Sequence, residues 1–223
     1  RPTRDDYTRY AKIVGRLQHL PAQSTAFIPA DVPEIISDSV RLYLGLLHCA
    51  KPVVTGSFSK EGFEVMHRLL LAVRGSAGAL REKPLAMFTC APTTPLSWSD
   101  LTAQNLLDCA TAGIPVEVVS MPLAGFTSPV TVVGTVIQHT AEVLSGVVLG
   151  QLVRPGTPVL FGGCPAIFDV RYESAPMGAV ESMMIACGVA EVGRRLGLPT
   201  QGYIGLSDAK IPDAQAGIET SMG

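Results

Sequence analysis

Two acidic residues follow expected β-strands, a position at which α/β proteins often carry functional groups. Asp169 and Asp208 each come shortly after a short apolar run expected to be a β-strand, and Arg171 and Lys210 follow them by two residues. Because parallel α/β proteins carry their functional groups at the C-terminal ends of strands, we expect Asp208 and Lys210 to be catalytic. Asp169 and Arg171 are candidates for substrate binding. An ordinary cap or turn is the alternative role for each carboxylate.

Aromatic side chains are scarce, at 6% of the residues, yet five of them fall on or just beyond expected strand ends. They are Trp98, Phe126, Phe161, Phe168 and Tyr203. A ring face attracts a quaternary ammonium ion through its quadrupole, and several rings form a cage whose selectivity comes from shape. We therefore interpret all of them except Phe126 as candidates for substrate binding. Filling space between the strand ends is the alternative for each ring.

The sequence contains no motif for several other common chemistries. No Gly-x-Gly-x-x-Gly follows an expected strand, because Gly162-Gly163 lacks the third glycine, which argues against nucleotide binding. The five cysteines and four histidines include no Cys-x-x-Cys or His-x-x-x-His spacing, so no metal site is expected. His139, in the middle of an apolar segment, is expected to be a hydrogen-bonded structural residue.

Composition limits the partners and the compartment. Charged residues make up 16% of the 223 residues and the formal net charge is −2, so nucleic acid and anionic membranes are not expected partners. The five cysteines are odd in number and lie in apolar runs, which indicates reduced thiols and a cytoplasmic protein. The most apolar segment, residues 130–153, is broken by polar residues and is expected to be a buried helix.

Short apolar runs rich in β-branched residues alternate with longer helical patterns, which predicts β-α-β units. The expected strands are residues 24–28, 52–57, 85–90, 115–121, 158–161 and 200–205. The expected helices are residues 5–20, 33–49, 60–74, 99–112, 129–152 and 177–196.

The turns between these elements are asymmetric. Gly113, Gly156 and Gly197 each precede a proline by two residues, which stops a helix and turns the chain sharply into a strand. The loops after the strands are longer, as expected of a TIM (β/α)8 barrel, whereas a doubly wound open sheet is the structural alternative. Because six strands are counted where a barrel needs eight, we expect residues 1–223 to form a single, incomplete barrel domain that lacks both termini.

Several ordered blocks of sequence resemble the trimethylamine methyltransferase family. They include Ala91-Pro-Thr-Thr-Pro-Leu-Ser-Trp98, Met121-Pro-Leu-Ala-Gly125, Gln138-His-Thr-Ala-Glu142 and Gly205-Leu-Ser-Asp-Ala-Lys210. The likeness covers most of the chain from about residue 31 onward. It implies a TIM-barrel enzyme that moves a methyl group from a methylated amine to Co(I) of a corrinoid (cobalamin) cofactor carried by a separate corrinoid protein.

The resemblance also narrows the donor. Family members that use trimethylamine itself carry pyrrolysine, whereas every residue here is one of the standard twenty. This favours the branch that includes glycine betaine methyltransferase, with a quaternary or tertiary methylamine as donor. We expect a homo-oligomer, with Thr94, Pro122, Gly163 and Ser207 gathered on one face as contacts to the cofactor.

Two other functions remain open at this point. One is a TIM-barrel lyase or aldolase in which Lys210 forms a Schiff base, which would require a desolvated lysine with a depressed pKa. The other is a subunit without catalysis that binds the corrinoid protein.

Overall fold

A computed structural model describes all residues, Arg1–Gly223, and the chain divides into two compact units. The first unit consists of Arg1–Cys90, Asp100–Val116 and Gly150–Pro158. The second unit consists of Ala91–Ser99, Glu117–Leu149 and Val159–Gly223. A single barrel domain over residues 1–223 stays a prediction.

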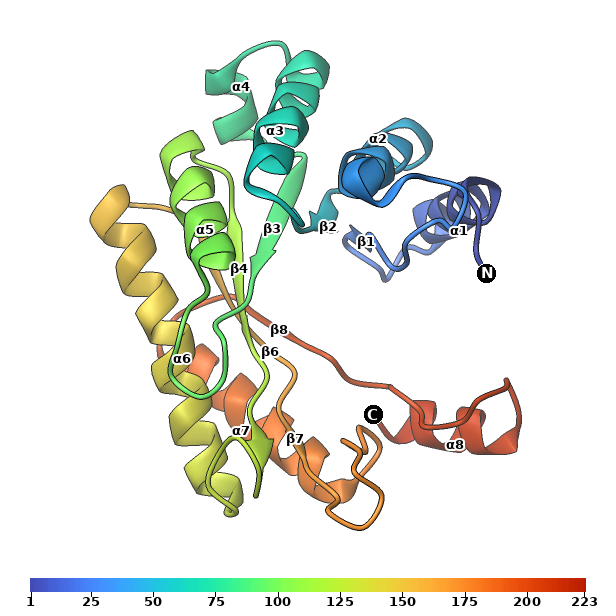
Figure 1. The fold of residues 1–223 in the computed structure, drawn as a ribbon, viewed down its shortest axis with the longest axis vertical. Coiled ribbons are helices and arrows are strands. Elements are labelled where there is room, and N and C mark those ends of the chain that lie inside the picture. The colour runs from blue at the N-terminus through green and yellow to red at the C-terminus, as the bar shows by residue number, and fades with distance from the viewer. The chain divides into compact units, whose positions relative to one another are not determined.

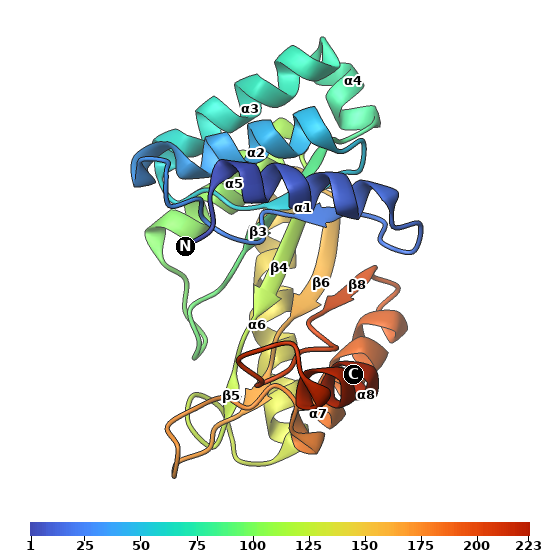
Figure 2. The same cartoon turned by 90° about the vertical axis from the view of Figure 1, so that its right-hand side faces the viewer.

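In the first unit, parallel strands alternate with helices. Strand β2 (Val53–Thr55) pairs in parallel with β1 (Gln23–Ser24) and with β3 (Ala86–Cys90). The helical elements are α1 (Arg4–Arg16), the 3-10 helix η1 (Glu34–Ile36), α2 (Ser37–His48), α3 (Lys60–Arg74), α4 (Ala77–Glu82) and α5 (Asp100–Ala112). Helices α1, α2 and α3 lie side by side in this unit (Figure 2).

Helix α3 illustrates how the sequence forms these elements. Ser59 caps its start by accepting a hydrogen bond from the backbone N–H of Gly62, and Gly75, with φ of 89°, ends it in the left-handed conformation. Phe63, Met66 and Leu70 recur at helical spacing and form its buried face. The Phe63 ring contacts the ring of Phe88 on β3 at a centroid distance of 5.3 Å, which fixes α3 against the sheet.

Strand β4 (Val116–Ser120) begins in the first unit and continues into the second. In the second unit, β6 (Val159–Gly163) pairs in parallel with β8 (Thr200–Gly202), and β5 (Leu123–Ala124) pairs in parallel with β7 (Ala166–Ile167). The helices are α7 (Val180–Arg195), α8 (Ala214–Met222) and most of α6 (Val132–Val153), which enters the first unit at Gly150. Helix α7 packs on β6, β7 and β8 (Figure 1).

A glycine allows α7 to approach the strands closely. A Cβ at Gly193 would lie 2.3 Å from Cγ2 of Thr200 on β8 and 3.1 Å from Cδ1 of Phe161 on β6. Any larger residue at this position would therefore separate the helix from the two strands that end at the cavity described below.

Most of the expected organisation is confirmed. Each expected strand and helix has a counterpart, and the parallel pairing holds for β1 with β2, β2 with β3 and β6 with β8. Gly113, Gly156 and Gly197 have φ of 73°, 83° and 70°, as helix stops require. The sequence did not predict α4, β5 or β7. The parallel α/β class is therefore established, and the closed eight-stranded barrel remains a prediction.

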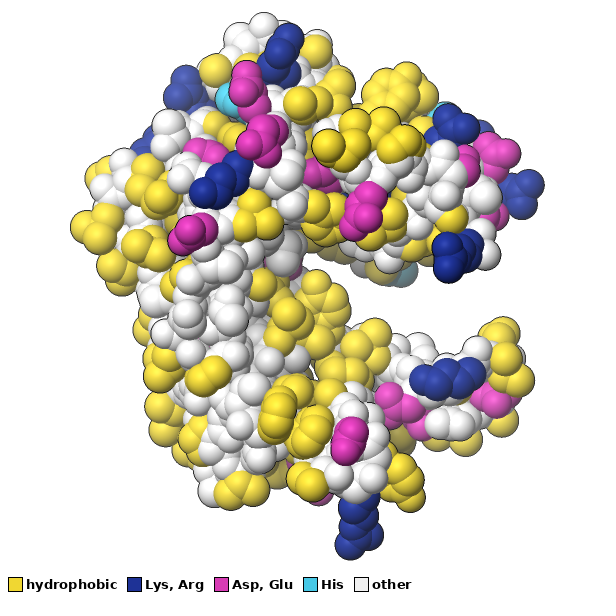
Figure 3. Space-filling model, in the orientation of Figure 1, with side chains coloured by type: hydrophobic (Ala, Val, Ile, Leu, Met, Phe, Trp, Pro, Cys, Tyr) yellow, Lys and Arg dark blue, Asp and Glu magenta, His cyan; other side chains and the backbone are white.

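The prediction of a buried helix for residues 130–153 is correct for one face of the helix and wrong for the other. Thr135, His139 and Val143 lie on the buried face of α6, but Val133 and Leu152 are 68% and 78% exposed. Hydrophobic side chains line the edge of the molecule along which α6 runs (Figure 3). By length and composition alone α6 is able to cross a membrane, with 28% of its apolar window buried, which is a weak indication because core helices meet the same test.

Candidate functional site

A cavity of about 230 Å³ lies in the second unit, beside the C-terminal ends of β6 and β8. Gly163 ends β6, and the segment from Tyr203 to Leu206 continues the chain beyond β8. Helix α7 contributes Met183 and Cys187 to the wall. Parallel strands thus bring their C-terminal ends to the same place, where ligand sites of α/β proteins form.

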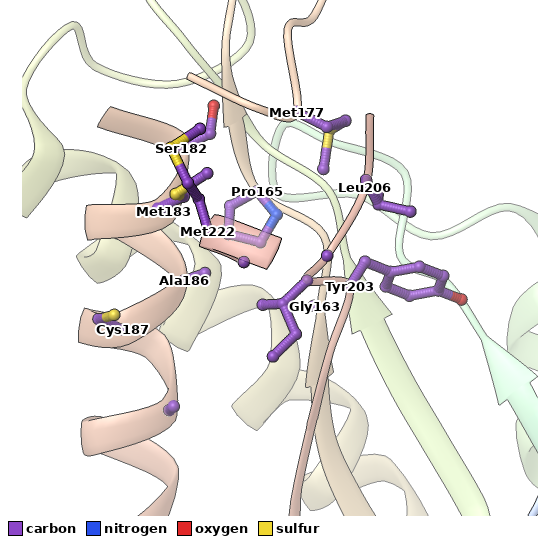
Figure 4. A pocket seen from close by; sticks show the side chains of 14 residues that line it. Gly163, Pro165, Met177, Ser182, Met183, Ala186, Cys187, Tyr203, Leu206 and Met222 are labelled. Carbon is purple, nitrogen blue, oxygen red and sulfur yellow. The ribbon is translucent and has the colours of Figure 1, made fainter. Parts of the chain in front are cut away.

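The side chains around this cavity are mainly apolar and sulfur-containing. Met177, Met183, Cys187 and Met222 all line it (Figure 4). The Tyr203 side chain lies on the opposite side from Met183, with its hydroxyl directed away from the methionines (Figure 4). No Asp, Glu, Lys, Arg or His side chain lines the cavity, so it suits a ligand recognised through methyl groups, shape and ring contacts.

The two polar side chains at the cavity have distinct environments. Ser182 is committed to internal hydrogen bonds, because its hydroxyl donates to the Pro176 carbonyl at 3.0 Å and accepts from the Ile167 N–H at 3.1 Å. Burial raises the pKa of Tyr203, helped by the charges of Glu117 and Cys164, so the phenol is neutral at neutral pH. Neither group is arranged as a nucleophile with an adjacent base.

His139 lies behind the end of β6 and is fully buried. Its Nε2 is 3.0 Å from the carbonyl oxygen of Gly162, and its Nδ1 has no hydrogen-bond partner. Desolvation lowers its pKa to about 4, against the opposing effects of the Gly162 hydrogen bond and the charge of Glu142. The ring is therefore neutral at neutral pH and Nε2–H donates to Gly162, consistent with the structural role expected from the sequence.

Two of the predicted site residues line the cavity, and a third lies beside it. Gly163 and Tyr203 are wall residues, and Ser207 follows the wall residue Leu206. The Ser207 hydroxyl donates to Oε2 of Glu219 at 2.6 Å. This commits Ser207 to holding its own loop against α8, which leaves its predicted cofactor contact a proposal.

The predicted catalytic pair lies on the same loop. The backbone N–H of Asp208 donates to Oε2 of Glu219 at 2.8 Å, while the Asp208 side chain is exposed. Lys210 is exposed as well. The desolvation that a Schiff-base lysine requires is therefore not present at Lys210 in this structure.

Three of the four predicted aromatic residues lie outside the cavity. Phe161 is fully buried and its ring contacts His139 at a centroid distance of 5.4 Å, so it fills the core. The Trp98 indole Nε1–H donates to the Ser145 hydroxyl on α6 at 2.9 Å. Phe168 stacks on Phe126 at 4.5 Å. The structure thus brings Tyr203 alone of the four to the cavity wall.

The remaining candidates serve local geometry in this structure. The Asp169 carboxylate accepts from the backbone N–H of Arg171 at 2.8 Å, which closes a turn and leaves the Arg171 side chain exposed. The Thr94 hydroxyl donates to Oε2 of Glu142 at 3.0 Å. The Pro122 carbonyl accepts from the Ala166 N–H at 3.2 Å, beside the β5–β7 pair. None of these residues lines the cavity.

Sequence reasoning missed the carboxylates that hold the loops and the methionines of the wall. Glu142 follows Gln138 by four residues, a spacing that places both on one side of a helix and was available as a signal. Glu219 accepts hydrogen bonds from Asp208 and Ser207, which lie eleven and twelve residues before it. No local sequence pattern predicts these contacts. Methionine at helical spacing is typical of ordinary core packing, so its place in a cavity wall was not predictable.

The chain has parallel strands followed by helices and a cavity at the C-terminal ends of two strands. It therefore belongs to the class of α/β proteins, whose ligand sites lie at that end of the strands. The model of the family described as trimethylamine methyltransferase (MTTB) matches residues 1–223. The chain belongs to this family.

Named relatives agree with the family match. The chain is 33% identical over 220 residues to the trimethylamine methyltransferase MttB of Desulfitobacterium hafniense (strain DSM 10664 / DCB-2), covering 99% of the chain and 44% of that protein. It is 31% identical over 221 residues to the glycine betaine methyltransferase of D. hafniense (strain Y51), covering 99% and 46%. It is 42% identical over 148 residues to MttB of Methanosarcina thermophila, covering 66% and 31%. The chain thus spans less than half the length of these relatives.

Proposed function

We propose that this chain forms part of a methyltransferase that takes a methyl group from a quaternary or tertiary methylamine. The observation that carries the proposal is the family match along all 223 residues. The cavity beside β6 and β8 supports it, because methionines, small residues and one tyrosine line it and no charged side chain does. Relatives named for trimethylamine and for glycine betaine both match nearly the whole chain.

The proposed acceptor is Co(I) of a corrinoid that a partner protein carries. Co(I) would supply the electron pair that takes up the methyl group, and the electron pair of the carbon–nitrogen bond would stay on nitrogen. A quaternary donor therefore leaves as a neutral amine, and no general base is needed. The task of this chain's residues is to align the donor and to exclude water.

Exposed apolar loops support a protein partner for the second unit. Phe126, Val170 and Tyr172 lie in loops after the β5 and β7 strands and are 66%, 74% and 79% exposed. The two loops follow paired strands, and exposed large apolar side chains on neighbouring loops are typical of surfaces that another protein covers. We assign the corrinoid protein to this side of the second unit.

A screen of methylated amines tests the proposed function. Purified protein is mixed with Co(I) cobalamin and with trimethylamine, glycine betaine, carnitine or proline betaine in turn, and the visible spectrum follows methylation of cobalt. We expect at least one donor to change the spectrum in a protein-dependent manner. Failure with every donor, or borohydride trapping of a carbonyl compound on Lys210, would overturn the proposal.

Removing the Tyr203 ring is expected to weaken donor binding. Tyr203→Ala should cost about 0.5–2 kcal/mol of binding free energy, the range for a cation–π contact, which isothermal titration with the active donor measures. Tyr203→Phe keeps the ring and should bind the donor nearly as the wild type does. Tyr43→Ala, at a ring that is 52% exposed and outside the cavity, is the matched control. Unchanged donor affinity in Tyr203→Ala would show that the ring only fills space.

Asp208→Asn is expected to affect methyl transfer without affecting stability. If the exposed carboxylate faces the cationic donor, removing its charge should lower kcat/KM by roughly tenfold for each 1.4 kcal/mol of lost transition-state stabilisation. Asp213→Asn is the matched control, since Asp213 caps α8 through the Ala216 N–H at 3.0 Å and asparagine caps equally well. Wild-type rates in Asp208→Asn would eliminate a catalytic role for this carboxylate.

A further inference from the structure

The loop after β3 forms a tight hairpin with a strained tip. Thr93 and Ser97 exchange two backbone hydrogen bonds of 2.7 Å and 3.0 Å. Between them Leu96 has φ of 51°, in the left-handed region, and its side chain is 68% exposed. A leucine adopts this conformation only when surrounding contacts hold it there, because its Cβ crowds the backbone.

Glu142 on α6 supplies those contacts. Its side chain is 1% exposed, and one oxygen, Oε1, accepts from the Leu96 N–H at 2.9 Å and from the Gln138 side chain at 3.0 Å. The other oxygen, Oε2, accepts from the Thr94 hydroxyl at 3.0 Å and from the Ser120 hydroxyl through a short bond. The carboxylate thus joins the hairpin, the end of β4 and α6.

The partners of Glu142 indicate that its carboxylate holds the surrounding groups in place. All four donors are uncharged, although burying a carboxylate is costly and is usually balanced by a cation. Two acceptor oxygens suffice for four donors, an arrangement that no apolar side chain and no single hydroxyl provides. The tip of the hairpin is therefore bound by a residue that lies 46 positions from Leu96 in sequence.

We propose that Glu142 is a positioning residue for methyl transfer, which fixes the Leu96 hairpin at the C-terminal end of β3. This inference rests on the proposed function, because the hairpin, Glu142 and the cavity all belong to the second unit. Thr94 was expected to contact the cofactor, and here it helps to hold the hairpin through its hydrogen bond to Glu142.

Trp98 reports the position of the hairpin directly. It is the one tryptophan among the 223 residues, and it sits at the base of the hairpin with its Nε1–H bonded to Ser145 on α6 at 2.9 Å. A hairpin that leaves α6 takes the indole into water. The emission maximum and acrylamide quenching of Trp98, corrected with a Trp98→Phe variant, therefore measure positioning without any activity assay.

Two replacements of Glu142 separate positioning from charge. Glu142→Gln keeps the shape and one acceptor oxygen, and its amide can donate to the two hydroxyls, so the Trp98 signal should stay at the wild-type value. Glu142→Leu keeps the volume and removes every acceptor, so Trp98 emission should move to the red and quenching should rise about twofold or more. Glu191→Leu, at an exposed ion pair of α7, is the control.

The strain at Leu96 gives a second, independent test. Glycine adopts the left-handed conformation without cost, so Leu96→Gly should restore part of the Trp98 signal in the Glu142→Leu background and leave it unchanged in the wild type. The test also applies if the Glu142→Leu protein folds poorly. In that case Leu96→Gly should restore its folding, because the two residues are expected to be coupled. Equal effects of Leu96→Gly in both backgrounds, or a wild-type Trp98 signal in Glu142→Leu, would overturn the inference.

Kinetics then connect the hairpin to the reaction. With the donor found in the screen, Glu142→Leu should lower kcat roughly 10- to 100-fold with a smaller change in KM, as misplacement of a supporting element does, and Glu142→Gln should recover most of kcat. A displaced hairpin with wild-type kcat would refute the positioning role while leaving the proposed function intact. Absence of transfer in the wild type would instead refute the proposed function, and the Trp98 measurements would still decide whether Glu142 fixes the hairpin.

Discussion

Alanine at Gly163 is expected to destabilise the protein by about 1–3 kcal/mol, the usual cost of overpacking a core. A Cβ at this position would lie 2.0 Å from Nε2 of His139, whose ring is fully buried. The Gly162 hydrogen bond that holds the ring would be disturbed as well. Chemical denaturation of Gly163→Ala at neutral pH measures the loss.

Two comparisons isolate the contact between Gly163 and the His139 ring. Gly202→Ala, on β8, adds a Cβ with nothing within 4 Å, so it should change the unfolding free energy far less. The second comparison is the pair Gly163→Ala and His139→Ala, whose combined cost should be smaller than the sum of the single costs because the smaller side chain removes the clash. Full additivity would show that the ring is not what excludes a side chain at Gly163.

Acidification is expected to remove about 3 kcal/mol of unfolding free energy through His139 alone. Burial lowers its pKa in the folded protein to about 4 from the usual 6.5, so the folded state keeps the ring neutral. Above pH 6.5 the ring is neutral in both states and the contribution is complete. As pH falls through the interval from 6.5 to about 4, the unfolded chain binds the proton first and stability decreases.

The prediction is tested by measuring the pH dependence of unfolding in the wild type and in His139→Gln. Glutamine does not titrate and still has an N–H that can donate to the Gly162 carbonyl. The variant should therefore lose less stability than the wild type between pH 7 and pH 4, by about 3 kcal/mol. His19→Gln, at an exposed ring, is the control for replacing a histidine by glutamine. Identical curves for wild type and His139→Gln would contradict a neutral, buried His139.

Local sequence signals located most elements of the fold. Helix α3 occurs at the predicted residues 60–74, because Ser59, Gly75 and the apolar spacing between them are contained in the segment itself. The short strands β5 and β7 were missed, since each has two residues and exists only through pairing with the other. Strand β8 ends at Gly202, before the predicted end at 205, because its parallel register with β6 stops there.

The residues that line the candidate site were predicted less completely than the fold. The sequence indicated that strand ends would carry it, and Gly163 and Tyr203 do line the cavity. Phe161 is also on a strand near its end, yet its side chain points into the core toward His139. Alternation along a strand decides which face a side chain occupies, and which face is the core depends on where the helices pack.

The sequence by itself determined the alternation of strands and helices, the glycine stops and the family resemblance, because each is carried by residues close together in the chain. The tertiary structure alone decided that Glu142 holds the Leu96 hairpin and that Glu219 holds the loop of Asp208. It also decided that the His139 ring requires glycine at position 163. These contacts join residues many positions apart, and their partners are selected by packing, about which local propensity carries no information.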